Sequence, residues 1–95
     1  METVYSVAES TGLFAENDIK VRITPYKHYK IGENKKDFMH VFGNIMEGRS
    51  TVQKAELSRK ITEKLDMMFP NISILSINIR EFEKATYCNK SLIAR

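Results

Sequence analysis

One stretch, from residue 36 to residue 82, constrains the fold of this chain more than any other, because it has the pattern of a strand, a capped helix and a second strand. Ser50 and Gln53 have capping-box spacing, and an apolar stripe follows them at helical spacing. The stripe consists of Val52, Leu57, Ile61, Leu65, Met68 and Phe69. Pro70 ends the helix, and apolar residues then predict a buried strand over 72–82. This order predicts a βαβ unit with two parallel strands.

Before this unit the sequence predicts another helix and another strand. Residues 3–11 have apolar residues at helical spacing and precede Gly12, a typical C-terminal cap. Residues 19–24 alternate apolar and polar side chains, which is the period of a half-buried strand. Turn residues at 32–34 predict that this strand pairs antiparallel with the strand at 36–46, which has apolar residues on both faces and is expected to be central.

We therefore expect a single α+β domain over residues 1–95, in the order α-β-β-α-β, with a mixed sheet packed under two helices. A chain of 95 residues, 42% of them hydrophobic, can bury one modest core but has no room for a separate catalytic lobe. Residues 84–95 are expected to form a loosely structured arm that docks on a neighbouring subunit.

The composition also limits the setting and the partners. Cys88 is the single cysteine, and the start of the chain lacks the features of a secretory signal, so we expect a reducing, cytoplasmic setting. No apolar run approaches the ~20 residues of a membrane helix, and we expect no membrane partner. The net charge of +3 comes from interspersed basic and acidic residues, which does not indicate a nucleic-acid-binding protein.

A local concentration of basic and aromatic side chains at residues 26–36 leaves one alternative open. On a hairpin, these side chains could follow phosphates and stack on bases. We favour a solvated strand face instead, because charge on exposed strands also blocks edge pairing.

Three basic residues are the candidate ligands for an anion. Arg49 directly precedes the predicted helix start, where open backbone N–H groups and a partial positive charge favour a carboxylate or a phosphate. Lys20 and Arg22 are two residues apart on the predicted strand, so both face the same side and can point at one ligand or into an intersubunit cleft. The alternative for each is an ordinary surface residue that pairs with a neighbouring carboxylate.

Other chemistry-bearing residues have weaker patterns. A histidine on a central strand, such as His40, is more often a hydrogen-bonded packing residue than a catalyst. His28 is twelve residues away, and no cysteine or carboxylate has metal-ligand spacing to either histidine, so we expect no metal. Cys88 lacks a recognisable nucleophile motif. We find no glycine-rich phosphate loop and expect no cofactor.

The sequence resembles the 5-carboxymethyl-2-hydroxymuconate isomerase family of the tautomerase superfamily. The resemblance rests on the run Phe38-x-His40-x-x-x-x-Ile45-x-x-Gly48-Arg49-Ser50, and on the preceding segments Thr11-Gly12-Leu13-Phe14 and Ile19-Lys20-Val21-Arg22. It implies a fold of two βαβ units, a homotrimer with active sites near subunit boundaries, and a keto–enol proton shift on a carboxylated dienol from aromatic catabolism. The implied general base is an amino-terminal proline at the start of the first strand, and basic side chains hold the substrate carboxylates.

The chain departs from this family pattern at its start. Residue 2 is Glu2, the prolines Pro25 and Pro70 are internal, and the family's first strand and its proline have no counterpart. The amine of Met1 is chemically a base, with an ordinary pKa near ~7.7 to 8.0, but nothing in the sequence places it in a pocket. We therefore expect no catalytic residue of the family kind here.

The resemblance predicts Arg49, Arg22 and Lys20 as substrate-binding residues, although Lys20 replaces the family's usual arginine and cannot clamp a carboxylate in the same bidentate way. Two interpretations of the chain stay open. It is a truncated form of a longer isomerase, or it is a short homologue that has lost catalysis and binds small carboxylates or a protein partner. In both cases an open sheet edge would favour oligomerisation.

Overall fold

The computed structural model describes residues 1–15, 18–32 and 37–93. Its elements follow the order α1 (Glu2–Ser10), β1 (Phe38–Met46), α2 (Thr51–Met68), β2 (Ile74–Phe82) and a short 3₁₀ helix, η2 (Lys90–Leu92). β1 and β2 pair in parallel, in a register that begins with Phe38 opposite Ile74 and ends with Met46 opposite Phe82. The predicted α+β class and the parallel βαβ unit are confirmed.

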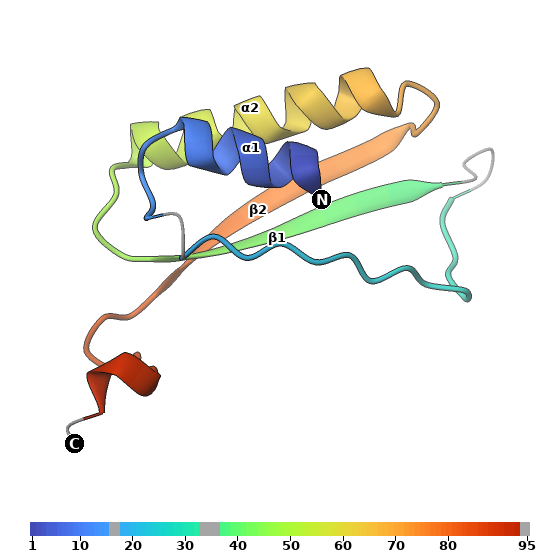
Figure 1. Ribbon diagram of the computed structural model, residues 1–95. Helices are drawn as coiled ribbons and strands as arrows, with labels where there is room; N and C mark the ends of the chain where they lie inside the picture. The colour runs from blue at the N-terminus through green and yellow to red at the C-terminus, as the bar shows by residue number, and fades with distance from the viewer. Residues whose placement is uncertain (16–17, 33–36, 94–95) are drawn as a thin grey trace.

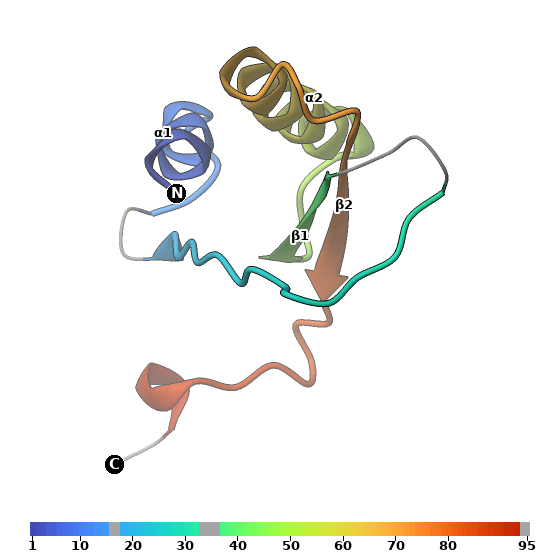
Figure 2. The same ribbon diagram turned by 90° about the vertical axis from the view of Figure 1, so that its right-hand side faces the viewer.

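Both helices lie on one face of the sheet, side by side and antiparallel (Figures 1 and 2). Thr3, at the start of α1, donates a hydrogen bond from its hydroxyl to the Met68 sulfur at the end of α2, at 2.8 Å. α1 ends as predicted, because Gly12 follows it with a φ of +71°, a left-handed conformation that glycine adopts without steric cost.

The core lies between the helices and the covered face of the sheet. Its buried residues are Val7 of α1 and the α2 residues Leu57, Ile61 and Leu65. The side chains packed around them come from both strands, from α1 and from the loop after α1: Val4, Phe14, Met39, Val41, Leu75, Ile77 and Ile79. The centre of the predicted apolar stripe therefore forms the core.

The two ends of that stripe are exposed. Val52 is 73% exposed, because five residues at about 100° each turn it roughly 140° away from Leu57 around the helix. Met68 is 52% exposed at the last turn of α2, where it contacts Thr3. The sequence pattern overestimated the length of the buried face.

The face of the sheet away from the helices is covered by neither helix (Figure 2). We call it the open face, and its exposed residues are Phe38, His40, Phe42 and Asn44 of β1 and Ile74, Ser76, Asn78, Arg80 and Phe82 of β2. Parallel sheets are ordinarily buried on both faces. The open face is therefore an unusual surface for a parallel pair of strands.

The predicted strand at residues 19–24 is wrong. These residues form no strand, so the observed order is α-β-α-β, and the expected antiparallel pair and mixed sheet do not form among the described residues. β1 was expected to be central, but within this part of the chain it pairs with β2 alone. The apolar residues Ile19 and Val21 are half-buried, as the alternating pattern predicts. A strand also needs a hydrogen-bonding partner along its length, and a local pattern does not specify that partner.

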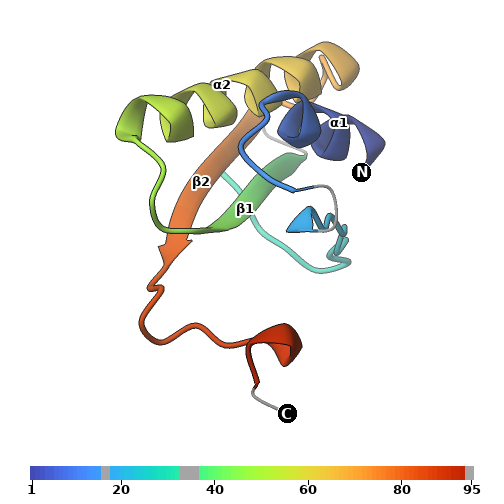
Figure 3. The same cartoon turned by 60° about the vertical axis from the view of Figure 1, so that its left-hand side comes forward.

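After β2 the chain leaves the sheet on the side away from the helices (Figures 1 and 3). Two contacts tie its first residues to the strands. The backbone N–H of Lys84 donates to Glu47 Oε1 at 2.9 Å, and the Tyr87 ring stacks on Phe82 with a centroid separation of 5.4 Å. Neither α1 nor α2 is long and apolar enough to cross a membrane, and the same holds for every helix among residues 1–15, 18–32 and 37–93.

We predict that Ile61→Ala lowers the free energy of unfolding by about 2–4 kcal/mol, because Ile61 is 4% exposed and its truncation leaves a cavity in the small core. The measurement is urea unfolding followed by circular dichroism at one protein concentration. Val52→Ala, in the same helix, is the matched control and should change stability by no more than about 0.5 kcal/mol. Equal effects of the two substitutions would contradict the described core.

Candidate functional site

A four-residue connection, Glu47–Ser50, joins the end of β1 to the start of α2 and positions Arg49. Gly48 adopts a φ of +118°, which L-residues with side chains rarely adopt, so glycine is required at this position by its backbone conformation. The turn brings the chain out of the sheet and directly into the first turn of α2 (Figure 3). Arg49 therefore lies where the carboxyl end of a strand meets a helix N-terminus.

The predicted capping box is present at this helix start. The Gln53 backbone N–H donates to Ser50 Oγ at 3.1 Å, and the Ser50 backbone N–H donates to Gln53 Oε1 at 2.8 Å. These bonds satisfy two of the four N–H groups that a helix leaves open at its start. The exposed residues Thr51 and Val52 carry the other two, which face the same end of α2 as Arg49.

The Arg49 guanidinium is held by three contacts. Nη1 donates to the Met46 carbonyl at 3.0 Å, and Nη2 donates to the Leu13 carbonyl at 2.6 Å. The guanidinium carbon also lies 4.9 Å from the centroid of the Phe14 ring, in cation–π geometry. An arginine has five N–H donors, so these bonds leave three for another acceptor. Leu13 and Phe14 follow α1, and the arginine thus joins the α1 loop to the end of β1.

The carboxyl ends of both strands meet beside this turn. The Glu47 backbone N–H donates to the Phe82 carbonyl at 3.2 Å and extends the parallel pairing by one bond. Lys54, in the first turn of α2, forms an ion pair with Glu81 near the end of β2, with 2.6 Å between Nζ and Oε1. Ligands in open parallel sheets bind characteristically outside the carboxyl ends of the strands. The surroundings of Arg49 are of this kind.

Glu81 is the titratable group near the turn whose pKa is shifted. Its hydrogen bond with Lys54 and the positive charge of that lysine lower the pKa of the Glu81 carboxyl below its ordinary value of 4.5, against a smaller opposing effect of desolvation. A backbone hydrogen bond from Gly48 acts in the same direction as Lys54. The ionised carboxylate therefore connects the helix, the strand end and the glycine turn.

Lys20 and Arg22 are exposed residues of the described segment 18–32. Because this segment is not a strand, the two-residue alternation that was expected to point both side chains to one side does not apply. No hydrogen bond, ion pair or ring contact joins Arg22 to Arg49 within the described residues. Their assignment as substrate-binding residues stays a prediction.

The amine of Met1 lies at the opposite end of the helical layer from Arg49. Met1 caps the start of α1, and Thr3 contacts Met68 at the end of α2, whereas Arg49 precedes the start of α2. The 18 residues of α2 span about 27 Å at 1.5 Å per residue. This separation argues against the Met1 amine as a base for a substrate held by Arg49.

His40 lies on the open face of the sheet rather than beside the turn. Its Nδ1 is 2.6 Å from Ser76 Oγ, and its ring packs edge-on against Phe42 with 4.4 Å between centroids. The hydrogen-bonded role that the sequence favoured agrees with this geometry. His40 is exposed, however, because its strand has no second layer on this face within the described residues.

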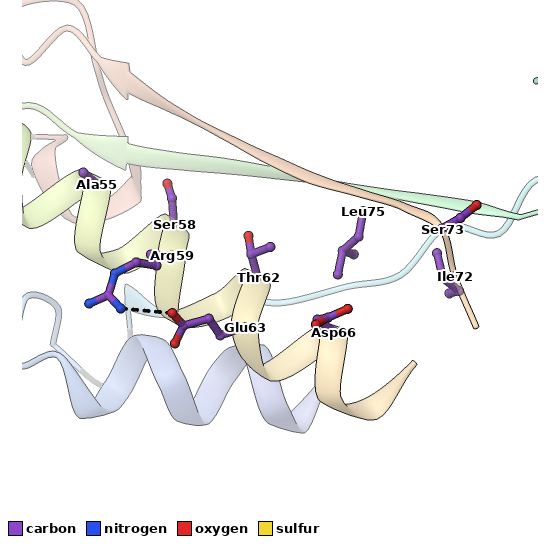
Figure 4. Close-up of a pocket in the computed structure, with 9 residues that line it drawn as sticks. All are labelled: Ala55, Ser58, Arg59, Thr62, Glu63, Asp66, Ile72, Ser73 and Leu75. Atoms are coloured by element: carbon purple, nitrogen blue, oxygen red, sulfur yellow. Dashed lines mark hydrogen bonds and ion pairs between the residues drawn. The ribbon is translucent and has the colours of Figure 1, made fainter. Parts of the chain in front are cut away.

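A groove lies between α2 and the start of β2 on the described surface (Figure 4). Ser58 and Thr62 point from α2 toward the strands, and Leu75 points from β2 toward the helix. The groove also contains Glu63 and Asp66, while its one arginine, Arg59, already pairs with Glu63 at 3.0 Å. This charge pattern suits a carboxylate ligand poorly, and none of the three predicted anion-binding residues lines the groove.

Sequence reasoning missed the partners of Arg49. Phe14 and Leu13 were noticed only as part of a family-like segment, and the Lys54–Glu81 pair joins residues 27 positions apart. The available signal was a glycine cap followed at once by two apolar residues, which indicates that the chain folds back onto the core after α1. Among the described residues, no group of three or more histidine, cysteine, aspartate or glutamate side chains could hold a metal ion.

The lowered pKa of Glu81 predicts an acid-sensitive contribution to stability. A group whose pKa is lower in the folded state stabilises the fold above its unfolded pKa, and this stabilisation is lost as the pH falls below 4.5 through the folded pKa. Glu81→Gln should therefore lose less stability than the unmodified protein between about pH 6 and about pH 3. Urea midpoints at the two pH values measure the difference. Lys54→Met should reproduce the effect, and unchanged pH dependence in both variants would contradict this role of the pair.

One comparison with known proteins agrees with the resemblance inferred from the sequence. A search of curated proteins finds no match. The family model described as 5-carboxymethyl-2-hydroxymuconate isomerase matches residues 1–95, which include the Gly48-Arg49-Ser50 turn and the loop that holds Arg49. With its parallel βαβ unit and this match over its whole length, the chain belongs to the 5-carboxymethyl-2-hydroxymuconate isomerase family.

Proposed function

We propose that this protein acts in keto–enol isomerisation of a carboxylated dienol, the chemistry of its family's name, and that Arg49 binds a carboxylate of the substrate. The supporting observation is the position of Arg49 at the carboxyl ends of the parallel strands, immediately before the N-terminus of α2. Arg49 has three further guanidinium N–H donors, and Thr51 and Val52 carry open N–H groups at the adjacent helix start. A carboxylate would find both a full positive charge and the favourable end of the helix dipole there.

The proposed reaction moves one proton and needs no oxidant or second substrate. The dienol O–H bond breaks, the carbonyl forms, and a carbon of the conjugated chain gains a proton. A base must accept the first proton or relay it, and cationic groups must stabilise the enolate that develops. Arg49 can supply the cationic part. We do not assign the base to the Met1 amine, because α1 starts beside the far end of α2, a helix about 27 Å long.

The contacts of Arg49 also support a second candidate function. A protein that binds the carboxylated compound at Arg49, without converting it, needs the same turn and the same arginine but no base. Direct binding and turnover therefore have to be measured separately. Binding tests the role of Arg49, and turnover tests isomerase activity.

We predict that Arg49→Ala weakens binding of cis,cis-muconate, a diene dicarboxylate, by about ten- to a hundred-fold, because a charge-assisted hydrogen bond contributes about 1.5–3 kcal/mol. Isothermal titration calorimetry measures the dissociation constant. Arg59→Ala is the matched control, since Arg59 is an exposed arginine of α2 that pairs with Glu63. Equal affinities of the Arg49 and Arg59 variants would remove Arg49 from the binding site.

Turnover is measured as loss of the dienol absorbance of 2-hydroxymuconate above its spontaneous rate. The 95-residue chain is compared with a version extended at its amino terminus by a strand that begins Met-Pro, with the first residue of each verified by mass. Turnover that depends on Arg49 in either version supports the isomerase proposal. Binding without turnover in both versions supports the binding function, and neither binding nor turnover contradicts both.

We also propose that the protein is a homotrimer that buries the open face. The exposed aromatic residues Phe38, Phe42 and Phe82 support this, with exposed fractions of 41%, 69% and 42%. A parallel sheet with one uncovered face gains stability when a second layer excludes water from it. Arg80 is the only Lys, Arg, Asp or Glu among the residues of the open face, so little charge opposes this burial.

Phe42→Asp should therefore convert the trimer to monomer, because it places a carboxylate in the centre of the open face. Sedimentation velocity at several protein concentrations measures the assembly. Met67→Asp, at a residue of α2 that is 74% exposed, is the control and should leave the assembly unchanged. A monomer before any substitution would contradict the proposed assembly.

A further inference from the structure

The Phe14 ring lies in the loop after α1 and has two neighbours of different kinds. One is the Arg49 guanidinium, whose central carbon lies 4.9 Å from the ring centroid. The other is the core, because half-buried Phe14 packs against the cluster formed by Val7, Leu57 and other α2 residues. The ring is therefore anchored by the core while part of its surface faces a cation.

The loop that carries Phe14 is itself fixed by local hydrogen bonds. Thr11 Oγ1 donates to the Ala8 carbonyl at 2.6 Å and accepts from the Leu13 backbone N–H at 3.3 Å. Gly12 makes the left-handed turn between them, with a φ of +71°. The Leu13 carbonyl then accepts from Arg49 Nη2 at 2.6 Å. Two successive residues of one ordered loop thus hold the arginine, Leu13 through a hydrogen bond and Phe14 through its ring.

We propose that Phe14 is a positioning residue for carboxylate binding at Arg49. The inference rests on the proposed function, because it concerns how Arg49 presents its free donors. The Phe14 ring occupies one side of the guanidinium group, so an acceptor reaches the remaining N–H donors from another direction. The ring also excludes water from the side that it covers, which strengthens the remaining charge-assisted hydrogen bonds.

This arrangement restricts the direction from which a carboxylate can approach Arg49. The Met46 and Leu13 carbonyls already occupy two donors, so a ligand meets a side chain with a fixed plane and a restricted set of open N–H groups. Without the ring, only the two carbonyl hydrogen bonds would restrain the guanidinium, and its orientation about the Cδ–Nε bond would be less restricted. Phe14 would then affect affinity through Arg49, without touching the ligand.

Phe14→Leu tests the role, because leucine retains an apolar side chain in the core but has no aromatic face. We expect it to raise the dissociation constant for cis,cis-muconate roughly two- to five-fold, the range of a partly exposed cation–π contact. Phe14→Tyr retains the ring and should bind like the unmodified protein. If Phe14→Leu does not fold, Phe14→Met replaces it, and urea unfolding confirms the fold of each variant.

A double-mutant cycle with Arg49→Ala separates positioning from a general structural effect. In the Arg49→Ala background, Phe14→Leu should cause no further loss of affinity. An equal loss in both backgrounds would overturn the proposal, and so would unchanged affinity of Phe14→Leu in the presence of Arg49.

If Arg49→Ala itself leaves the affinity unchanged, the proposed function fails at Arg49 and the positioning role fails with it. If Arg49→Ala weakens binding and Phe14→Leu does not, only the positioning role fails.

Discussion

The packing of one stripe of α2 against the covered face of the parallel strands determines most of the other features of this protein. Leu57, Ile61 and Leu65 are the buried residues of α2, and they fix how the helix lies across the sheet. Once that position is set, the connection from β1 must turn sharply within Glu47–Ser50, which requires the left-handed Gly48 and the Ser50 cap. Arg49 is located by this turn. Its position at the strand ends is thus a consequence of core packing combined with a short connection.

The parts of the fold that the sequence predicted well are those that depend on local chemistry. The capping box of α2 needs only residues three positions apart, the glycine after α1 needs only its own backbone freedom, and the βαβ order follows from successive local patterns. The strand prediction for residues 19–24 was wrong for the opposite reason. Its alternation is a local property, but strand formation depends on a neighbouring edge with free N–H and C=O groups, and that neighbour comes from elsewhere in the sequence. The prediction that Val52 belongs to the buried stripe was wrong because Val52 lies roughly 140° from Leu57 around the helix.

The candidate site was predictable in its central residue but not in its contacts. Arg49 could be identified from the strand-to-helix junction, because a cation before a helix N-terminus has a general electrostatic consequence. Its hydrogen bond to the Leu13 carbonyl spans 36 residues, and its cation–π contact with Phe14 depends on how α1 packs against α2. The periodicity of apolar residues in a sequence does not predict contacts between residues so far apart in the chain. The same limit applies to Lys20 and Arg22, whose expected shared direction came from a strand that the structure does not contain.

The contacts of Arg49 also bear on whether an arginine already bonded to protein can still bind a substrate. A free arginine side chain loses roughly 2 kcal/mol of rotamer entropy when it is held in one position. Here the Met46 and Leu13 carbonyls and the Phe14 ring impose that loss during folding, before any ligand arrives. The two carbonyls are neutral acceptors, so they leave the positive charge of the guanidinium uncompensated, whereas a salt bridge to an aspartate or glutamate would cancel it. A carboxylate that binds the remaining donors therefore meets a full charge in a fixed orientation, which is the condition under which structural contacts and ligand binding reinforce each other.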